Sequence, residues 1–162
     1  MTGRTRDDGA AGFSGSFSAF VPAPADAVFA LVTDVARLPE WNRAVTRVLE
    51  APEVPAPGAE WVVVVKPDGW PSWPSRSRVL ELDPQRGVFG YRAQSDDGNP
   101  SYADWRWHIV PEAGGARLTV TWELHPQTFW RKHLFARLRR RRLSKTEVPA
   151  SVAALTRVLS AP

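Results

Sequence analysis

The clearest pattern of hydrophobic and polar positions is a strict alternation towards the end of the chain. In residues 116–124, ARLTVTWEL, polar side chains separate Leu118, Val120, Trp122 and Leu124. Successive side chains of a β-strand point to opposite faces of its sheet. The segment therefore predicts a strand with one dry face and one wet face, as in an antiparallel sheet.

Segments with the same period of two precede it and predict the rest of the sheet. The turn sequences DPQRG, SDDGNP and PEAGG separate the later segments, so these strands are joined by short connections and run antiparallel. About seven strands are expected, at 12–21, 44–50, 60–66, 75–82, 88–94, 102–110 and 116–124.

Helical spacing appears in two other places. After the first strand, Pro24 suits a first helical turn, and apolar residues follow at helical intervals until Val35. The segment RLPEWN (37–42) predicts a second short helix or turn. Near the C-terminus the helically spaced residues are Trp130, Leu134, Phe135, Leu138, Val148, Val152, Leu155 and Leu159. Pro149 predicts that this last element is one long kinked helix or two helices in series.

These elements predict a single α+β domain over residues 13–162. Residues 1–12 are polar and Gly-rich, and we expect them to be a flexible tail. The dry face of the sheet must be covered, and the C-terminal helix is the only element long enough to cover it. A curved antiparallel sheet wrapped around one helix leaves a gap that can serve as a pocket.

Composition excludes several classes of protein. The chain has no cysteine, which excludes disulfides, thiolate zinc sites and cysteine nucleophiles, and which fits a cytoplasmic location. It has no signal-like or membrane-spanning apolar run. The spacing of His108, His125 and His133 predicts no metal site. GxSxG, P-loop and GxGxxG motifs are absent, and no cofactor is expected.

The net charge of +4 comes from one segment. Residues 131–145 hold eight of the 21 basic residues and no acid, so the rest of the chain has a net charge of −4. Such a run is typical of a solvated helix face. The apolar residues within 129–145 leave open a peripheral contact with an anionic membrane, and an acidic partner protein is a further alternative. No nucleic-acid-binding motif accompanies the run, so nucleic acid is not an expected partner.

The stretch DWRWHIV (104–110) poses a choice of orientation. Either Trp105 and Trp107 face the core, or Asp104, Arg106 and His108 do. Burying unpaired charges costs several kcal/mol, whereas burying a large apolar side chain contributes about 1.5–3 kcal/mol. The tryptophans are therefore predicted to face inward, as core or as the wall of a cavity, with Asp104 and His108 as a surface pair.

The stretch SRSRVLEL (75–82) poses the same choice. If Leu80 and Leu82 are dry, alternation places Arg76 and Arg78 on the inner face. There they could bind an anionic group or polarise a carbonyl, with Tyr91 beside them as a hydrogen-bond donor or general acid. The alternative is that the arginines extend to solvent or pair with an acid such as Asp68.

The order of elements resembles the START-like helix-grip superfamily, in its polyketide cyclase/dehydrase and lipid-transport branch. The resemblance covers about residues 13–160. It rests on the order and spacing of Val21, residues 23–29, Asp34, residues 38–41, Gly58, Ser77, Arg78, Trp105, Gly114, Gly115 and residues 151–155. It implies a curved sheet of about seven strands around a long C-terminal helix, with a deep cavity for apolar or aromatic ligands.

The resemblance implies that the chain binds a polyketide-like, aromatic or lipid molecule. One alternative is a polyketide cyclase or dehydratase in which Arg78 and Tyr91 polarise substrate carbonyls, and another is an interaction protein acting through its basic helix. Trp41, Trp70 and Trp73 are candidates for the entrance of the cavity. The expected ligand-binding residues are Trp41, Trp61, Trp73, Arg76, Arg78, Tyr91, Trp105, Trp107, Trp122, Leu134 and Leu138.

Overall fold

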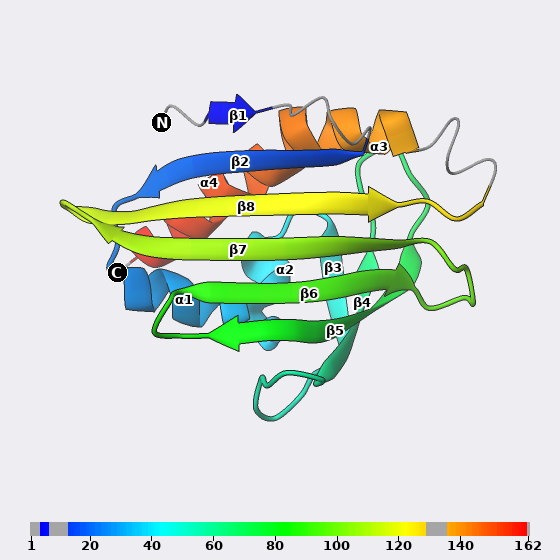
Figure 1. Cartoon of the computed structure of the whole chain (residues 1–162), viewed down its shortest axis with the longest axis horizontal. Helices are drawn as coiled ribbons and strands as arrows, with labels where there is room; N and C mark the ends of the chain where they lie inside the picture. The colour runs from blue at the N-terminus through cyan, green and yellow to red at the C-terminus, as the bar shows by residue number, and fades with distance from the viewer. Residues whose placement is uncertain (1–3, 7–12, 129–135, 162) are drawn as a thin grey trace.

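The chain forms a curved antiparallel sheet with helices packed against one of its faces (Figure 1). The computed structural model describes residues 4–6, 13–128 and 136–161. The strand order is β1-β2-β8-β7-β6-β5-β4-β3. The strands are β1 (Arg4–Arg6), β2 (Ser14–Val21), β3 (Val45–Glu50), β4 (Glu60–Val65), β5 (Trp73–Asp83), β6 (Val88–Ser95), β7 (Tyr102–Glu112) and β8 (Gly115–His125). The predicted helix-grip architecture is confirmed, and β1, within the segment expected to be a tail, adds a strand beside β2.

The helices after β2 form as their apolar spacing predicts. Helix α1 (Ala25–Thr33) starts after Pro24 and buries Val28, Leu31 and Val32. A short 3₁₀ turn (Val35–Arg37) leads into α2 (Leu38–Trp41), where Pro39 occupies the first turn and its missing N–H costs no helical hydrogen bond. Trp41 ends this helix and is buried, with 2% of its surface exposed.

The C-terminal helical run has three parts. Helix α3 (Ala136–Arg142) continues through a π-helical turn (Leu143–Glu147) into α4 (Val148–Ser160). The N–H of Val148 bonds to the carbonyl of Leu143, five residues back, just before Pro149 removes the next donor. The predicted irregularity at Pro149 is therefore a π-turn. Leu143, Val148, Val152 and Leu155 are buried, whereas Leu138 is 48% exposed.

The two faces of the sheet differ sharply in chemistry. We call the face that packs against α1, α2 and α4 the inner face. On β7 and β8 it carries Trp107, Ile109, Val120 and Trp122, all almost completely buried. The opposite, outer face carries ion pairs such as that of Arg106 with Glu81, at 3.3 Å. The prediction for DWRWHIV is confirmed, because its tryptophans lie inward and its charged residues outward.

Strand β5 corrects the prediction for SRSRVLEL. A β-bulge shifts the pairing with β6 between Val79 and Glu81. The extra residue changes which face the following positions occupy, so Val79 and Leu82 both contact the core while Leu80 is 50% exposed. Before the bulge, Ser75 and Ser77 are the buried residues of β5.

Arg76 and Arg78 were therefore predicted on the wrong face, and they lie on the outer one. The guanidinium of Arg76 contacts Asp96 at 3.1 Å and the carboxylates of Glu50 and Glu60 at 3.4 Å each. This cluster makes Arg76 part of the surface ion-pair network.

Candidate ligand site on the inner face

A row of aromatic side chains crosses the inner face of the sheet. The ring centroids of Trp61 on β4 and Tyr91 on β6 are 5.0 Å apart, and Tyr91 and Trp105 on β7 are 6.4 Å apart. Trp105 and Trp122 on β8 follow at 5.8 Å. Strands β4, β6, β7 and β8 thus each place one aromatic ring in this row, and β5, which lies between β4 and β6, contributes none to it.

A second aromatic contact links the sheet to the helices. Trp41 at the end of α2 meets the ring of Trp107 edge to face, with centroids 5.5 Å apart. Both residues are almost fully buried. This pair packs the end of α2 against the inner face at β7.

Part of the inner face keeps accessible surface. Trp61, Phe89, Trp107 and Trp122 are buried, whereas partial exposure remains at inner-face positions towards one end of the strands: Val65, Trp73, Tyr91, Trp105 and Leu124. Because the strands are antiparallel, the end of β8, the β4–β5 loop and the β6–β7 turn meet at this end, on the right in Figure 1. An accessible aromatic surface on the inner face is the geometry of a ligand site.

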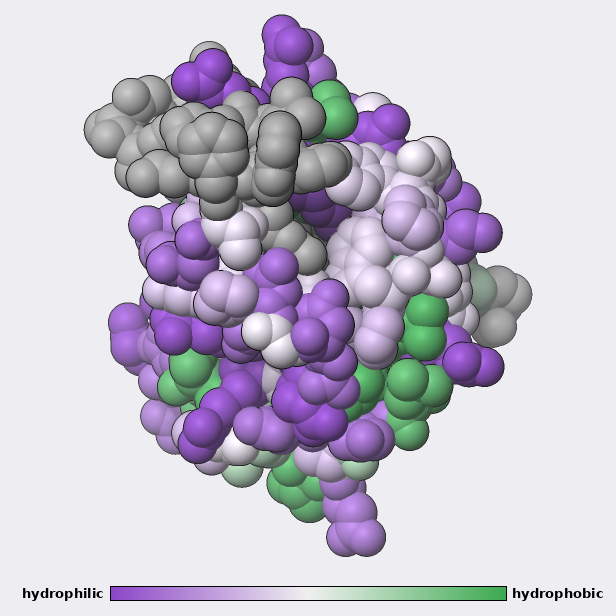
Figure 2. Space-filling model, turned by 90° about the vertical axis from the view of Figure 1, so that its right-hand side faces the viewer, coloured by the Kyte–Doolittle hydropathy of each residue, from purple (hydrophilic) through white to green (hydrophobic). Residues whose placement is uncertain are grey.

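Figure 2 looks directly at this end of the molecule. The described surface there is mostly hydrophilic, with small separate hydrophobic groups and a cluster of residues of intermediate hydropathy beside the grey atoms. Figure 2 shows no continuous apolar patch on the described surface of this end.

Tyr91 is the one ionisable residue among the described inner-face positions of β2 and β4–β8. Burial raises the pKa of its hydroxyl to about 12, and a hydrogen bond with the side chain of Trp107 opposes that rise. The indole N–H can only donate, so the oxygen of Tyr91 accepts this bond. The hydroxyl thus stays protonated, and its own hydrogen is available to an acceptor.

Two further donors lie in the interior. The Nε1 groups of Trp41 and Trp122 are buried and have no hydrogen-bond partner. An unsatisfied buried donor costs about 1–3 kcal/mol. An acceptor atom brought to either indole would recover part of this free energy.

The predicted ligand-binding residues divide into three groups. The inner face or the helix packed on it holds Trp41, Trp61, Trp73, Tyr91, Trp105, Trp107 and Trp122. Arg76 and Arg78 lie on the outer face, away from Tyr91, which pairs with Val79. The side chain of Leu138 is half exposed on α3, and Leu134 lies outside the described residues.

Ser75 and Ser77 are inner-face residues that the sequence did not identify. Their exposed fractions are 7% and 3%, and the hydroxyl of Ser75 donates to the carbonyl oxygen of Gln94 at 3.2 Å. Serine is common on either face of a sheet, so only knowledge of the bulge could have placed these residues inward.

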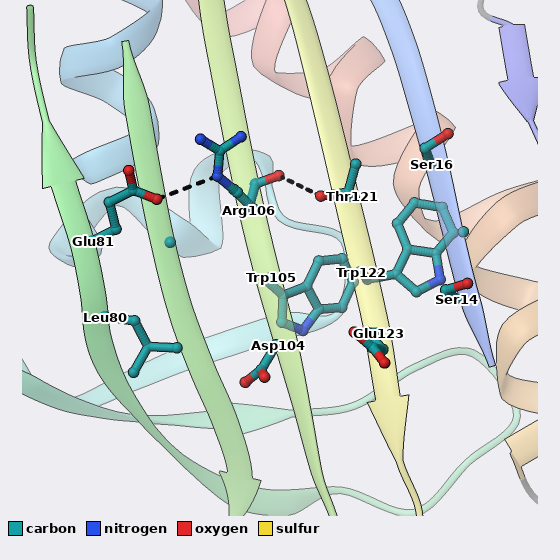
Figure 3. Close-up of a pocket in the computed structure, with 12 residues that line it drawn as sticks. Ser14, Ser16, Leu80, Glu81, Asp104, Trp105, Arg106, Thr121, Trp122 and Glu123 are labelled. Atoms are coloured by element: carbon teal, nitrogen blue, oxygen red, sulfur yellow. Dashed lines mark hydrogen bonds and ion pairs between the residues drawn. The ribbon is translucent and has the colours of Figure 1, made fainter. Parts of the chain in front are cut away.

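The outer face has an open depression of about 420 Å³ (Figure 3). Its polar rim includes Glu81, Asp104 and Arg106, and Gly90 leaves room at its centre because it has no side chain. The charged groups pair with one another: Arg106 with Glu81, and Asp104 with Arg92 at 2.7 Å. The lining also includes Trp105 and Trp122, so the depression combines surface ion pairs with two tryptophan positions, and we do not assign it a ligand.

The predicted surface pair of Asp104 and His108 was wrong. Asp104 binds Arg92 on β6 through both carboxylate oxygens, at 2.7 and 2.9 Å. The histidine beside it is His125, whose Nε2 lies 3.6 Å from Asp104. Asp104 and His125 come from adjacent strands, and this neighbour depends on strand register that the local sequence does not give. No cluster of potential metal ligands is found among the described residues.

The sequence matches the family model for polyketide cyclase / dehydrase and lipid transport over residues 13–160. The chain belongs to this family. No curated protein matches the sequence. None of the described helices has the length and apolar character needed to cross a membrane.

Solved structures share the fold at low identity. The polyketide-cyclase-like protein Cgl2372 from Corynebacterium glutamicum is 27% identical, with a TM-score of 0.61 and 91% of each chain covered. The di-domain ARO/CYC proteins BexL, from the BE-7585A pathway, and StfQ, from the steffimycin pathway, have TM-scores of 0.73 and 0.71 at 17% and 15% identity. This family member covers 52% of BexL and 50% of StfQ, while 94% and 91% of its own length is matched.

Proposed function

We propose that this family member binds an uncharged hydrophobic small molecule, polyketide-like, aromatic or lipid, against the inner face of its sheet. The observation that carries the proposal is the accessible surface of Tyr91 and Trp105 within an otherwise buried aromatic row. The described inner-face strand positions carry no formal charge near neutral pH, since Tyr91 stays protonated. A charged ligand would lose its hydration there without gaining an opposite charge.

Tyr91 supplies the polar recognition in this proposal. Its hydroxyl oxygen accepts from the Trp107 indole, so the hydroxyl hydrogen is left to donate to a ligand oxygen such as that of a ketone, quinone or ether. Because burial keeps the group protonated, Tyr91 acts as a donor. This chemistry favours ligands that combine an aromatic or aliphatic body with a hydrogen-bond acceptor.

Two fluorescent probes test whether the proposed ligand site is uncharged. N-phenyl-1-naphthylamine and 8-anilinonaphthalene-1-sulfonate share the same ring system and differ by a sulfonate. We expect the neutral probe to bind at least about tenfold more tightly than the sulfonated probe, because the sulfonate would be desolvated without a partner. Equal affinity, or tighter binding of the sulfonate, would contradict an uncharged site.

Tyr91→Phe tests the donor. In displacement of the neutral probe, 1-tetralone has a carbonyl acceptor and tetralin has none. We expect the substitution to weaken tetralone by roughly fivefold, the equivalent of one hydrogen bond, and to leave tetralin unchanged. The matched control is Tyr102→Phe, since Tyr102 is the second tyrosine of the chain and stacks on His125 of the outer face. Equal effects of the two substitutions would contradict the assignment.

A second candidate function is the polyketide cyclase or dehydratase activity that the two ARO/CYC relatives suggest. Its support is the protonated hydroxyl of Tyr91 on the aromatic surface, which can polarise a substrate carbonyl. Arg78 has no part in this candidate, because it lies on the outer face. Turnover of a poly-β-ketone analogue that is lost in Tyr91→Phe and retained in Tyr102→Phe is the expected result. If the analogue binds without turnover, only the binding function remains supported.

A further inference from the structure

Helix α3 exposes one narrow face of mixed cationic and apolar character. Arg137, Leu138, Arg141 and Lys145 are all exposed, and we call these four residues the cationic face. At 100° per residue the first three lie within one side of α3, and Lys145 follows them one turn later in the π-turn. Leu143, on the opposite side, is buried. The helix therefore has a fixed inner side and a fixed outer side.

Two other arginines of the basic run make contacts within the protein. Arg139 forms an ion pair with Glu147, and the pair is largely shielded from solvent. Arg142 donates to the main-chain carbonyl of Asp68, in the β4–β5 loop. These contacts hold α3 in one orientation, so the cationic face is the outward part of the run.

The charge of the whole chain is strongly asymmetric. Residues 131–145 carry eight basic residues, and the remainder has a net charge of −4. An anionic surface would attract the helix and repel the body, which orients the molecule with the cationic face towards that surface. Electrostatic attraction alone would suit any polyanion. The exposed apolar residue is therefore the feature that distinguishes one kind of partner from another.

We propose that the cationic face docks on an anionic lipid surface. Leu138 lies beside Arg141 at the edge of this face and is 48% exposed, so the face presents an apolar side chain next to its cations. At a bilayer its side chain enters the interface while the neighbouring guanidinium groups stay among the headgroups. Cations around an inserted apolar side chain are the pattern of an interfacial helix.

The docked orientation has a consequence for the ligand site. Arg142 ties α3 to the β4–β5 loop, which lies at the end of the sheet where the inner face is accessible. Docking would place this end near the lipid surface. That consequence rests on the proposed ligand site, whereas the docking itself does not require it.

Vesicle sedimentation tests the docking. The full chain is mixed with vesicles of phosphatidylcholine alone or with about 30 mol% phosphatidylglycerol, which gives the vesicles a negative surface potential. We expect binding to the anionic vesicles only, and loss of binding as salt shortens the range of the attraction. Equal binding to both vesicle types, or no binding to either, would overturn the proposal.

A matched pair of triple variants locates the surface. Arg137→Gln, Arg141→Gln and Lys145→Gln together should weaken binding on the order of a hundredfold, from the contribution of each cation near an anionic surface. The control, Arg43→Gln, Arg47→Gln and Arg157→Gln, removes the same charge from exposed residues elsewhere and should have a much smaller effect. Equal losses would show that only the net charge matters, and would refute a defined face.

Leu138→Gln separates a membrane from other polyanions. We expect roughly fivefold weaker binding to anionic vesicles, since a half-buried leucine contributes only part of its transfer free energy, and no change in binding to heparin. The proposal would be wrong if the protein binds heparin, nucleic acid or an acidic protein more tightly than vesicles and Leu138→Gln has no effect. The partner would then be that polyanion and not a membrane. If the triple variant fails to fold, Arg141→Gln and Leu138→Gln alone still test the face.

Discussion

The packing of Trp122 on Gly15 gives the sharpest prediction for stability. The two residues are paired across β2 and β8, and the indole lies where a side chain at position 15 would be. A Cβ added to Gly15 would lie 2.5 Å from Cζ2 and 2.8 Å from Cε2 of Trp122. Carbon atoms in contact normally lie about 3.5–4.0 Å apart. Gly15→Ala therefore requires the indole or the strand to move by roughly 1 Å.

The expected cost follows from how tightly Trp122 is held. Its side chain is 2% exposed and packs against Trp105. Overpacking a well-filled core costs about 1–3 kcal/mol, and replacing a strand glycine by alanine recovers about 0.5–1 kcal/mol. The net destabilisation is then about 1–2 kcal/mol, or a fall in Tm of roughly 2–8 °C for a domain of this size.

Gly90→Ala is the matched control. Gly90 also lies inside a strand, but its added Cβ would meet Glu81 Cβ at 3.5 Å, an ordinary contact. We expect it to leave the free energy of unfolding unchanged or to raise it slightly. Urea or thermal unfolding followed by circular dichroism measures both variants. Gly15→Ala as stable as Gly90→Ala would refute the steric argument, as would an undiminished cost of Gly15→Ala in a Trp122→Leu background.

Three other predictions follow from the site. Arg78→Ala should leave binding of the neutral probe unchanged, because this side chain lies on the outer face. Weaker binding would mean that Arg78 contributes to the ligand site. Trp107→Ala should lower the free energy of unfolding by about 3–5 kcal/mol. Trp105→Ala should lower it less but should weaken binding of the probe more, and unfolding and fluorescence titrations measure the two effects. Tyr91 has a pKa of about 12 in the fold against 10.0 unfolded, so its contribution to stability is complete below pH 10 and is lost as pH rises through 12. Tyr91→Phe should remove this loss from unfolding curves measured at increasing pH.

The sequence predicted the sheet and its inward tryptophans because each rests on local physics. Alternation in β8 and the cost of burying Asp104 and Arg106 are properties of a single strand, and both gave the correct faces. The fold followed from the order of such elements. The neighbours of each strand also require pairing between distant segments, which is why His125 was not recognised as the partner of Asp104.

The error in β5 shows what local physics omits. Alternation that is extended backwards from Leu80 and Leu82 places the arginines inward only if the ladder is unbroken. One extra residue at the bulge reversed the faces of all earlier positions, including Arg76 and Arg78. The alternation of serine, arginine and leucine in this bulged strand looks like that of a regular strand whose faces are exchanged. A bulge is a property of two paired strands, so the sequence of one strand did not reveal it.

The separation of charges and aromatic rings between the two faces has an evolutionary consequence. Each strand can be viewed as two interleaved sequences, with odd positions of β7 such as Trp105 and Trp107 facing the interior and even positions such as Asp104 and Arg106 facing water. Substitutions in one set leave the environment of the other nearly untouched. A lineage can therefore change the inner-face residues while keeping the polar outer face, and a designer can do the same by randomising only alternate codons of β6, β7 and β8.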